Sequence, residues 1–129
     1  MKLSKTAEYA LSIMAQLASA KSVVSVKTLH ERLNIPFQYT SKTLRMLYRS
    51  NLVITEQGRE GGYRLSRSAE TIMLSDIVEA VEPGYNYVNC IMGRDRCDSD
   101  KPCALHEQWA KPREQIRRML QETTLSSIS

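Results

Sequence analysis

The segment from Cys90 to His106 constrains this chain more than any other stretch of its sequence. It contains all three cysteines of the 129-residue chain and one of its two histidines. Glycine, proline and charged residues fill the intervals, so the segment is too polar and too broken to pack as a hydrophobic core. Three thiolates that converge on a metal centre would hold it in shape. We therefore expect a sensor whose other parts present this segment or respond to it.

The spacing of the cysteines leaves several chemistries open. The pattern is C-x6-C-x5-C, and His106 lies three residues after Cys103. Structural zinc usually takes cysteines in closely spaced pairs, and a disulfide would leave one cysteine over. Unligated buried thiols are expected in apolar surroundings, whereas a bulky iron–sulfur cluster suits wide spacing. Spacing alone leaves zinc and an iron–sulfur cluster equally open.

Composition indicates a globular protein in the cytoplasm. The chain is 42% hydrophobic and 25% charged, which is ordinary for one compact domain with at most a protruding element. No apolar run approaches the roughly 18 residues needed to cross a bilayer, and the N-terminal apolar residues follow helical periodicity rather than a signal-peptide pattern. We expect no membrane partner, and a compartment in which thiols stay reduced.

The positive charge is concentrated in one part of the chain. The net charge is +4, and residues 42–67 contain six basic residues against Glu56 and Glu60, which accounts for the whole excess. Such a run is either a solvated face or a phosphate-binding surface.

The secondary structure predicted for this basic part of the chain favours nucleic-acid binding. Helical periodicity predicts helices over 5–20, from Ser25 to about residue 33, and over 37–49, with a break at 34–36. Strand candidates at 52–56 and 63–66 flank a glycine-rich turn. A helix-turn-helix followed by a hairpin is a winged helix, which binds DNA or, in some proteins, only other proteins. The third helix is expected to bury Phe37, Leu44, Leu47 and Tyr48.

The same pattern assigns the DNA contacts. The third helix would enter the major groove, where glutamine and serine read base edges and basic residues hold phosphates. The hairpin arginines would reach the backbone or the minor groove. The predicted DNA-binding residues are Gln38, Tyr39, Ser41, Lys42, Arg45, Arg59 and Arg64.

The C-terminal part predicts a dimer. A fourth helix would begin at Ser75 and end at 83–84. Residues 105–119 then carry apolar side chains at spacings of 4, 3, 4 and 3, a heptad-like seam that favours a two-fold dimer through a long helix. Trp109 and Ile116 would lie in or beside the interface, Pro112 would kink or break the helix, and residues 123–129 would fray.

These elements predict a mainly α fold with a small β-hairpin. It is a winged helix-turn-helix domain (1–82), a cysteine cluster-binding loop (83–103), and a dimerisation helix with its tail (104–129). There is no nucleophile elbow, phosphate loop or carboxylate pair, so we expect neither an enzyme nor a small-molecule substrate.

Four stretches together resemble one family. They are the opening M-K-L-S-K-T-A-E-Y-A-L, the wing G-R-E-G-G-Y-R-L, the helix L-S-D-I-V-E-A-V-E, and C-A-L-H-E-Q-W with the cysteine trio. Over nearly the whole chain the sequence resembles the Rrf-two family of bacterial transcription regulators, which includes iron–sulfur sensors of the IscR and NsrR types. The resemblance implies a homodimeric repressor that binds a double-stranded DNA operator with an affinity set by a cluster. Some members lack the cysteines, and Pro112 departs from the family pattern.

The resemblance also implies a ligand set. It favours an iron–sulfur cluster on Cys90, Cys97, Cys103 and His106, of the 2Fe–2S type, with 4Fe–4S as the alternative. Glu8 is the rival fourth ligand, because it resembles the acidic residue that completes the cluster across the dimer in NsrR-type members. The signal (iron status, nitric oxide or oxidants), the operator and the DNA-binding form stay open. The alternative function is a zinc-stabilised or cluster-carrying binding module without gene-regulatory sensing.

Overall fold

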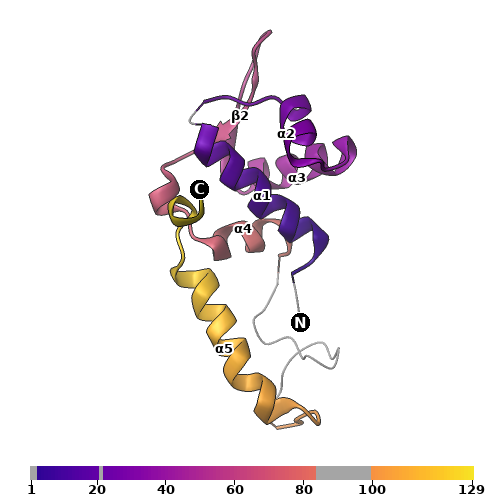
Figure 1. Ribbon diagram of the computed structural model, residues 1–129, viewed down its shortest axis with the longest axis vertical. Helices are drawn as coiled ribbons and strands as arrows, with labels where there is room; N and C mark the ends of the chain where they lie inside the picture. The colour runs from indigo at the N-terminus through magenta and orange to yellow at the C-terminus, as the bar shows by residue number, and fades with distance from the viewer. Residues whose placement is uncertain (1–2, 21, 84–99) are drawn as a thin grey trace.

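The computed structural model describes residues 3–20, 22–83 and 100–129. In Figure 1 the first four helices form a body, from which the hairpin projects at one end and α5 at the other. The predicted fold class, mainly α with a winged helix-turn-helix, is confirmed. The elements in order are α1 (Lys5–Ala20), α2 (Val26–Leu33), α3 (Phe37–Arg49), β1 (Val53–Glu56), β2 (Gly62–Leu65), the 3-10 turn η1 (Ala69–Thr71), α4 (Leu74–Val81), α5 (His106–Glu122) and the 3-10 turn η2 (Leu125–Ile128).

Local signals explain where α2 and α3 begin and end. The Ser25 hydroxyl accepts a hydrogen bond from the Thr28 amide at 3.1 Å and caps α2. Asn34 ends that helix in the left-handed conformation, with φ at 53°, which asparagine tolerates better than most residues. Pro36 then precedes the first residue of α3, so the turn between the two helices is short and well defined.

The core of the body joins α1, α3 and α4. Ala10, Ile13 and Leu17 recur along α1 at intervals of three and four, and all are at most 2% exposed. They pack in one cluster with buried residues of α3 and α4, including Leu44 and Ile77. Burial of each such branched side chain stabilises the fold by about 1.5–3 kcal/mol.

The hairpin is anchored through the first residues of β2, next to the turn, to the connection between α1 and α2. Strands β1 and β2 pair antiparallel from Val53↔Leu65 to Glu56↔Gly62. Val24 adds a short bridge, since its amide and carbonyl each bond to Tyr63 at 2.9 Å. A Cβ on Gly62 would collide with the Val24 carbonyl, so this close approach requires glycine.

The C-terminal residues belong to the body, and the predicted frayed tail is wrong. The side chain of Leu125 is fully buried in the core cluster. Its amide donates to the Ile72 carbonyl at 2.8 Å, and Met73 forms a β-bridge with Thr124. One apolar side chain and a short backbone ladder therefore order a segment that is polar in composition.

Helix α5 divides its apolar stripe into two rows. It continues through Pro112 rather than breaking there, and its last turns lie nearer the body than its first (Figure 1). An inner row holds Trp109, 6% exposed, and Ile116, which packs against the core cluster. The outer row, spaced by seven residues, holds Leu105, Pro112 and Met119, all of which are exposed. Because Trp109 is already buried within its own chain, the outer row is the one available to a second copy.

Candidate functional site

Helix α3 turns the predicted DNA-binding residues away from the core. Gln38, Tyr39, Lys42 and Arg45 are exposed and Ser41 is half-buried. The opposite face of the helix is formed by the buried residues Thr40, Thr43, Leu44 and Leu47. The helix has no side-chain cap and no acidic residue in its first turn, so its positive N-terminal end is not neutralised locally. The arrangement suits a polyanion.

Two aromatic residues of α3 lie where the sequence did not predict them. Phe37 is 51% exposed and Tyr48 is 50% exposed, so their expected burial is wrong. Thr40 and Thr43 occupy the inward positions instead. The Thr40 hydroxyl donates to the Pro36 carbonyl at 3.1 Å, which satisfies it away from water. Polar residues thus complete the inward face and displace the aromatic rings to the surface.

His30 fastens the turn and was missed by the sequence reasoning, which treated it as an ordinary surface residue. Its Nδ1 lies 3.0 Å from the Ile35 carbonyl oxygen, and since a carbonyl only accepts, Nδ1 must carry the hydrogen. The His30 carbonyl in turn accepts from the Ile35 amide at 3.2 Å. The imidazole also meets the Phe37 ring edge-on, with centroids 5.7 Å apart. A histidine shortly before an Asn-Ile-Pro turn was the available signal.

The two hairpin arginines are not equivalent. Arg59 is exposed in the turn between β1 and β2. Arg64 lies on β2, where its Nε is 2.8 Å from the Glu56 carboxylate of the neighbouring strand. Arg59 can therefore meet a phosphate directly, whereas Arg64 must first exchange a carboxylate partner.

An aromatic contact links α1 to the start of α3. The rings of Tyr9 and Tyr39 lie 6.1 Å apart at a tilt of 40°. Tyr9 directly follows Glu8, whose carboxylate is 3.3 Å from the Lys5 ammonium. The predicted DNA contact at Tyr39 therefore packs against the residue that follows the candidate acidic ligand of α1.

Half of the predicted ligand set can be placed. Cys90 and Cys97 lie outside the described residues. Cys103 carries a free thiol and is half-buried, and His106 is the half-buried first residue of α5. The His106 amide donates a hydrogen bond to the Cys103 carbonyl at 3.1 Å, so the two candidate ligand residues lie within one turn. A thiolate and an imidazole fit either zinc or an iron–sulfur cluster.

The ligand set is incomplete within residues 3–20, 22–83 and 100–129. No three His, Cys, Asp or Glu side chains in these ranges come together as a metal site. Glu8 stands near the start of α1, well separated from the start of α5 in Figure 1. Among the described residues, Glu8 and His106 of one chain therefore do not come together.

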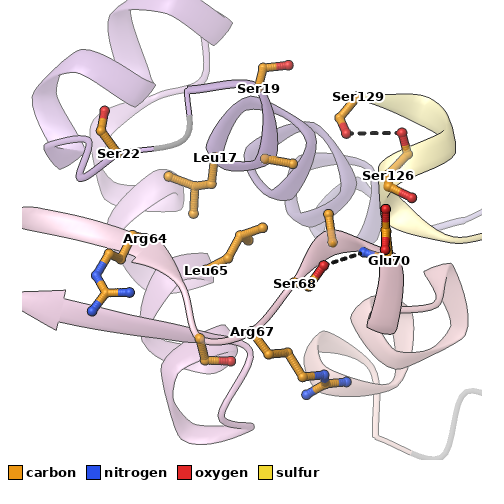
Figure 2. Close-up of a pocket in the computed structure, with 13 residues that line it drawn as sticks. Leu17, Ser19, Ser22, Arg64, Leu65, Arg67, Ser68, Glu70, Ser126 and Ser129 are labelled. Atoms are coloured by element: carbon orange, nitrogen blue, oxygen red, sulfur yellow. Dashed lines mark hydrogen bonds between the residues drawn. The ribbon is translucent and has the colours of Figure 1, made fainter.

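A surface cavity of about 800 Å³ opens where the end of α1, the segment after β2 and η2 meet (Figure 2). Several of its hydroxyls serve the local backbone: Ser68 accepts from the Glu70 amide at 3.2 Å, and Ser129 donates to the Ser126 carbonyl at 3.4 Å. Arg67 at its edge lies 3.5 Å from Asp76. Much of its polar lining is thus engaged within the chain.

Comparisons with known proteins assign the family. The sequence model of the Rrf2 family, described as iron-dependent transcriptional regulators, matches residues 3–129. The chain is 36% identical over 131 residues to a Mycobacterium tuberculosis protein named as an HTH-type transcriptional regulator, covering all of this chain and 81% of that one. It is 30% identical over 130 residues to the HTH-type transcriptional regulator IscR of Vibrio vulnificus, covering 99% and 77%.

Solved structures agree with that assignment. The fold resembles CymR, the global cysteine regulator of B. subtilis, with a TM-score of 0.80 and 26% identity, covering 98% of this chain and 94% of that one. It also resembles T. potens IscR in fold, with a TM-score of 0.75 and 24% identity, covering 98% and 84%. None of the described helices is both long and apolar enough to span a membrane. The chain belongs to the Rrf2 family of winged helix-turn-helix, DNA-binding transcriptional regulators.

Proposed function

We propose that this regulator senses its signal through an iron–sulfur cluster and acts as a homodimeric repressor. The observation that carries the proposal is the backbone hydrogen bond that holds Cys103 and His106 within one turn at the start of α5, at the end of the segment that contains all three cysteines. Their thiolate and imidazole would provide two ligands, and Cys90 and Cys97 the others. The cluster, when bound, supplies a centre whose charge and integrity respond to iron supply, oxidants or nitric oxide.

Family membership alone does not choose the signal. The same fold serves a global cysteine regulator as well as IscR. A metal centre is supported by the half-buried side chains of Cys103 and His106, whose backbones lie within one turn. The wide spacing of the three cysteines suits an iron–sulfur cluster. A 2Fe–2S cluster with three cysteines and one histidine is our first choice, and a 4Fe–4S cluster completed by Glu8 of a second chain is the alternative.

The dimer would form through α5. The exposed row of Leu105, Pro112 and Met119 repeats every seven residues, which is the period of a two-helix seam. Two copies related by a two-fold axis would present two α3 helices to a nearly palindromic operator.

Sensing would act on the spacing of the two α3 helices. The cysteine segment joins α4, which packs on α1 and α3, to α5, which carries the proposed dimer seam. Ligation at this junction would favour one arrangement of body and seam over others. Ligation by Glu8 would connect the cluster to α3 in a second way, because the neighbouring residue Tyr9 contacts Tyr39 of α3.

Anaerobic purification with iron, sulfide and zinc analysis and a visible spectrum tests the proposal. We expect a coloured protein with acid-labile sulfide, and an affinity for at least one operator that differs between the cluster-bound and cluster-free forms. His106→Ala should yield an altered or labile cluster, and Glu8→Ala should leave the spectrum unchanged. The reverse pattern would transfer the fourth-ligand role to Glu8. Stoichiometric zinc in place of iron would contradict the proposal.

The DNA surface has its own test in the salt dependence of binding. Arg59→Ala should weaken binding and reduce the slope of log K against log salt by about 0.9, the value for one lost phosphate contact. Arg64→Ala should change the slope less, because Glu56 already partners that guanidinium. Equal affinities for parent and Arg59→Ala at low and moderate salt would remove Arg59 from the DNA surface.

A further inference from the structure

We infer that Phe37 is a specificity-determining residue that packs against the 5-methyl group of a thymine in the major groove of the operator. The inference rests on the proposed DNA binding through α3 and deepens it, because it names a base and the atom that is read.

The position of Phe37 is the first support. It is the first residue of α3, and its ring is 51% exposed. In helix-turn-helix proteins the N-terminal residues of the second helix are those that approach base edges. About half of the side chain is open to solvent, so the ring can bury further apolar area against a partner outside the chain.

The ring is also held in place. The imidazole of His30 meets it at an interplanar angle of 87° with centroids 5.7 Å apart, which is a favourable edge-to-face arrangement. The imidazole is itself fixed by the 3.0 Å bond from Nδ1 to the Ile35 carbonyl. His30 is therefore a positioning residue, which limits the rotation of the Phe37 side chain before any DNA arrives.

Base chemistry selects the partner. The major-groove edges present hydrogen-bond donors and acceptors, which a phenyl ring cannot satisfy, and one apolar group, the 5-methyl of thymine. The next residue, Gln38, is exposed, and its amide suits the N6 and N7 atoms of adenine. Neighbouring residues at the start of α3 thus both favour A·T pairs.

The test uses duplexes selected by the full-length protein from a random-sequence library. Each thymine of the selected operator is replaced in turn by deoxyuridine, which removes only the methyl group. For the parent protein we expect one thymine per half-site at which the replacement weakens binding roughly three- to fivefold, the effect of one buried methyl. Phe37→Ala should bind the thymine operator more weakly and should not distinguish thymine from deoxyuridine there. Phe37→Leu should restore part of the discrimination.

Two further variants separate readout from structure. Tyr48→Ala removes an equally exposed ring from the other end of α3 and should keep the discrimination intact. His30→Ala should lower the ratio of thymine to deoxyuridine affinity while the helical circular dichroism stays unchanged, as expected for a positioning residue.

Each contrary outcome points to a different failure. If both proteins bind the operator and deoxyuridine replacement at every thymine affects them equally, Phe37 does not read a methyl group. If Phe37→Ala instead dissociates the protein in sedimentation, the ring is a contact between copies and the inference is overturned. If the parent protein selects no duplex at all, the proposed function fails before the inference is reached.

Discussion

The body and α5 differ in how their apolar side chains are buried from solvent. In the body, the inward residues of α1, α3 and α4 are nearly all sealed from solvent within one chain. In α5, the inner row is covered by the same chain, whereas Met119 of the outer row is 52% exposed and Leu105 is 41% exposed. A structure of one chain therefore explains the stability of the body but only half of the apolar pattern of α5.

This difference indicates that the body determines folding, whereas the outer row of α5 is available for assembly. The winged-helix body needs no partner to bury its core, so the residues predicted to contact DNA are positioned within a single chain. The outer row of α5 gains burial only when another surface covers it, which makes it the part of the molecule where assembly and regulation can act without unfolding the body.

The strongest test of this division concerns Leu125, which follows α5 in sequence but packs into the body. Leu125→Ala should lower the free energy of unfolding by about 2–5 kcal/mol, because it leaves a cavity in a filled core. Denaturant unfolding measures the change. Ile128→Ala is the matched control, since Ile128 is 47% exposed and should cost less than about 0.5 kcal/mol. Equal effects of the two substitutions would place the C-terminal turn outside the body.

The outer row can be tested by charge. Met119→Glu should raise the dimer dissociation constant at least roughly tenfold, because a carboxylate in an apolar seam loses its hydration. Sedimentation equilibrium measures the dissociation constant. The free energy of unfolding of the body should hardly change. Gln121→Glu is the control, because it adds the same charge two residues away and outside the heptad row. The Gln121 side chain accepts a hydrogen bond from Arg117 at 2.7 Å. This substitution should leave the dimer intact. A monomeric parent protein at micromolar concentration would contradict the proposed seam.

The smallest expected effect concerns the local stability of α5. Glu114 accepts hydrogen bonds from Arg117 and lies 3.6 Å from the Arg118 guanidinium. The hydrogen bonding by Arg117 holds the pKa of Glu114 below its ordinary value. The ionised form therefore stabilises the folded state above the ordinary carboxyl pKa of about 4.3, and this contribution is lost as the pH falls through the lower folded value.

Glu114→Gln should accordingly lower the melting temperature slightly at pH 7 and not at strongly acidic pH, as measured by calorimetry. Glu122→Gln is the control, since removing a negative charge from the C-terminal end of a helix should not destabilise it. A pH-independent difference for Glu114→Gln would show that α5 depends on other contacts.

Much of the body could be predicted because its sequence carries local signals. Ser25, Asn34 and Pro36 mark helix boundaries, and the glycines between the strands mark the hairpin. The inward face of α3 could not be read from hydrophobicity, because Thr40 and Thr43 complete it, and the Thr40 hydroxyl is satisfied by the Pro36 carbonyl on the preceding turn. His30 was missed for a related reason: its role depends on a hydrogen bond across the turn, which spacing does not reveal.

The site was less predictable than the fold. The spacing of 4 and 3 along α5 located its apolar stripe but not which row faces its own chain, because both rows share the seven-residue period. Leu125 was hidden in a polar stretch whose order depends on backbone pairing with Ile72. The roles of the cysteines, Glu8 and the DNA-contacting residues stay predictions, since each depends on a partner molecule.

The anchoring of the hairpin at Val24 and Gly62 has a consequence for how this regulator can diversify. Because a backbone bridge and a glycine contact hold the start of β2, changes in length or charge between Gln57 and Glu60 alter only the exposed tip. Gly58 there has a φ of 113° with open space around it, so the tip is limited by its own backbone and not by neighbours. The tip can therefore change in sequence while the packing of the helices stays as it is, and if the tip contacts DNA as predicted, such changes would alter operator preference.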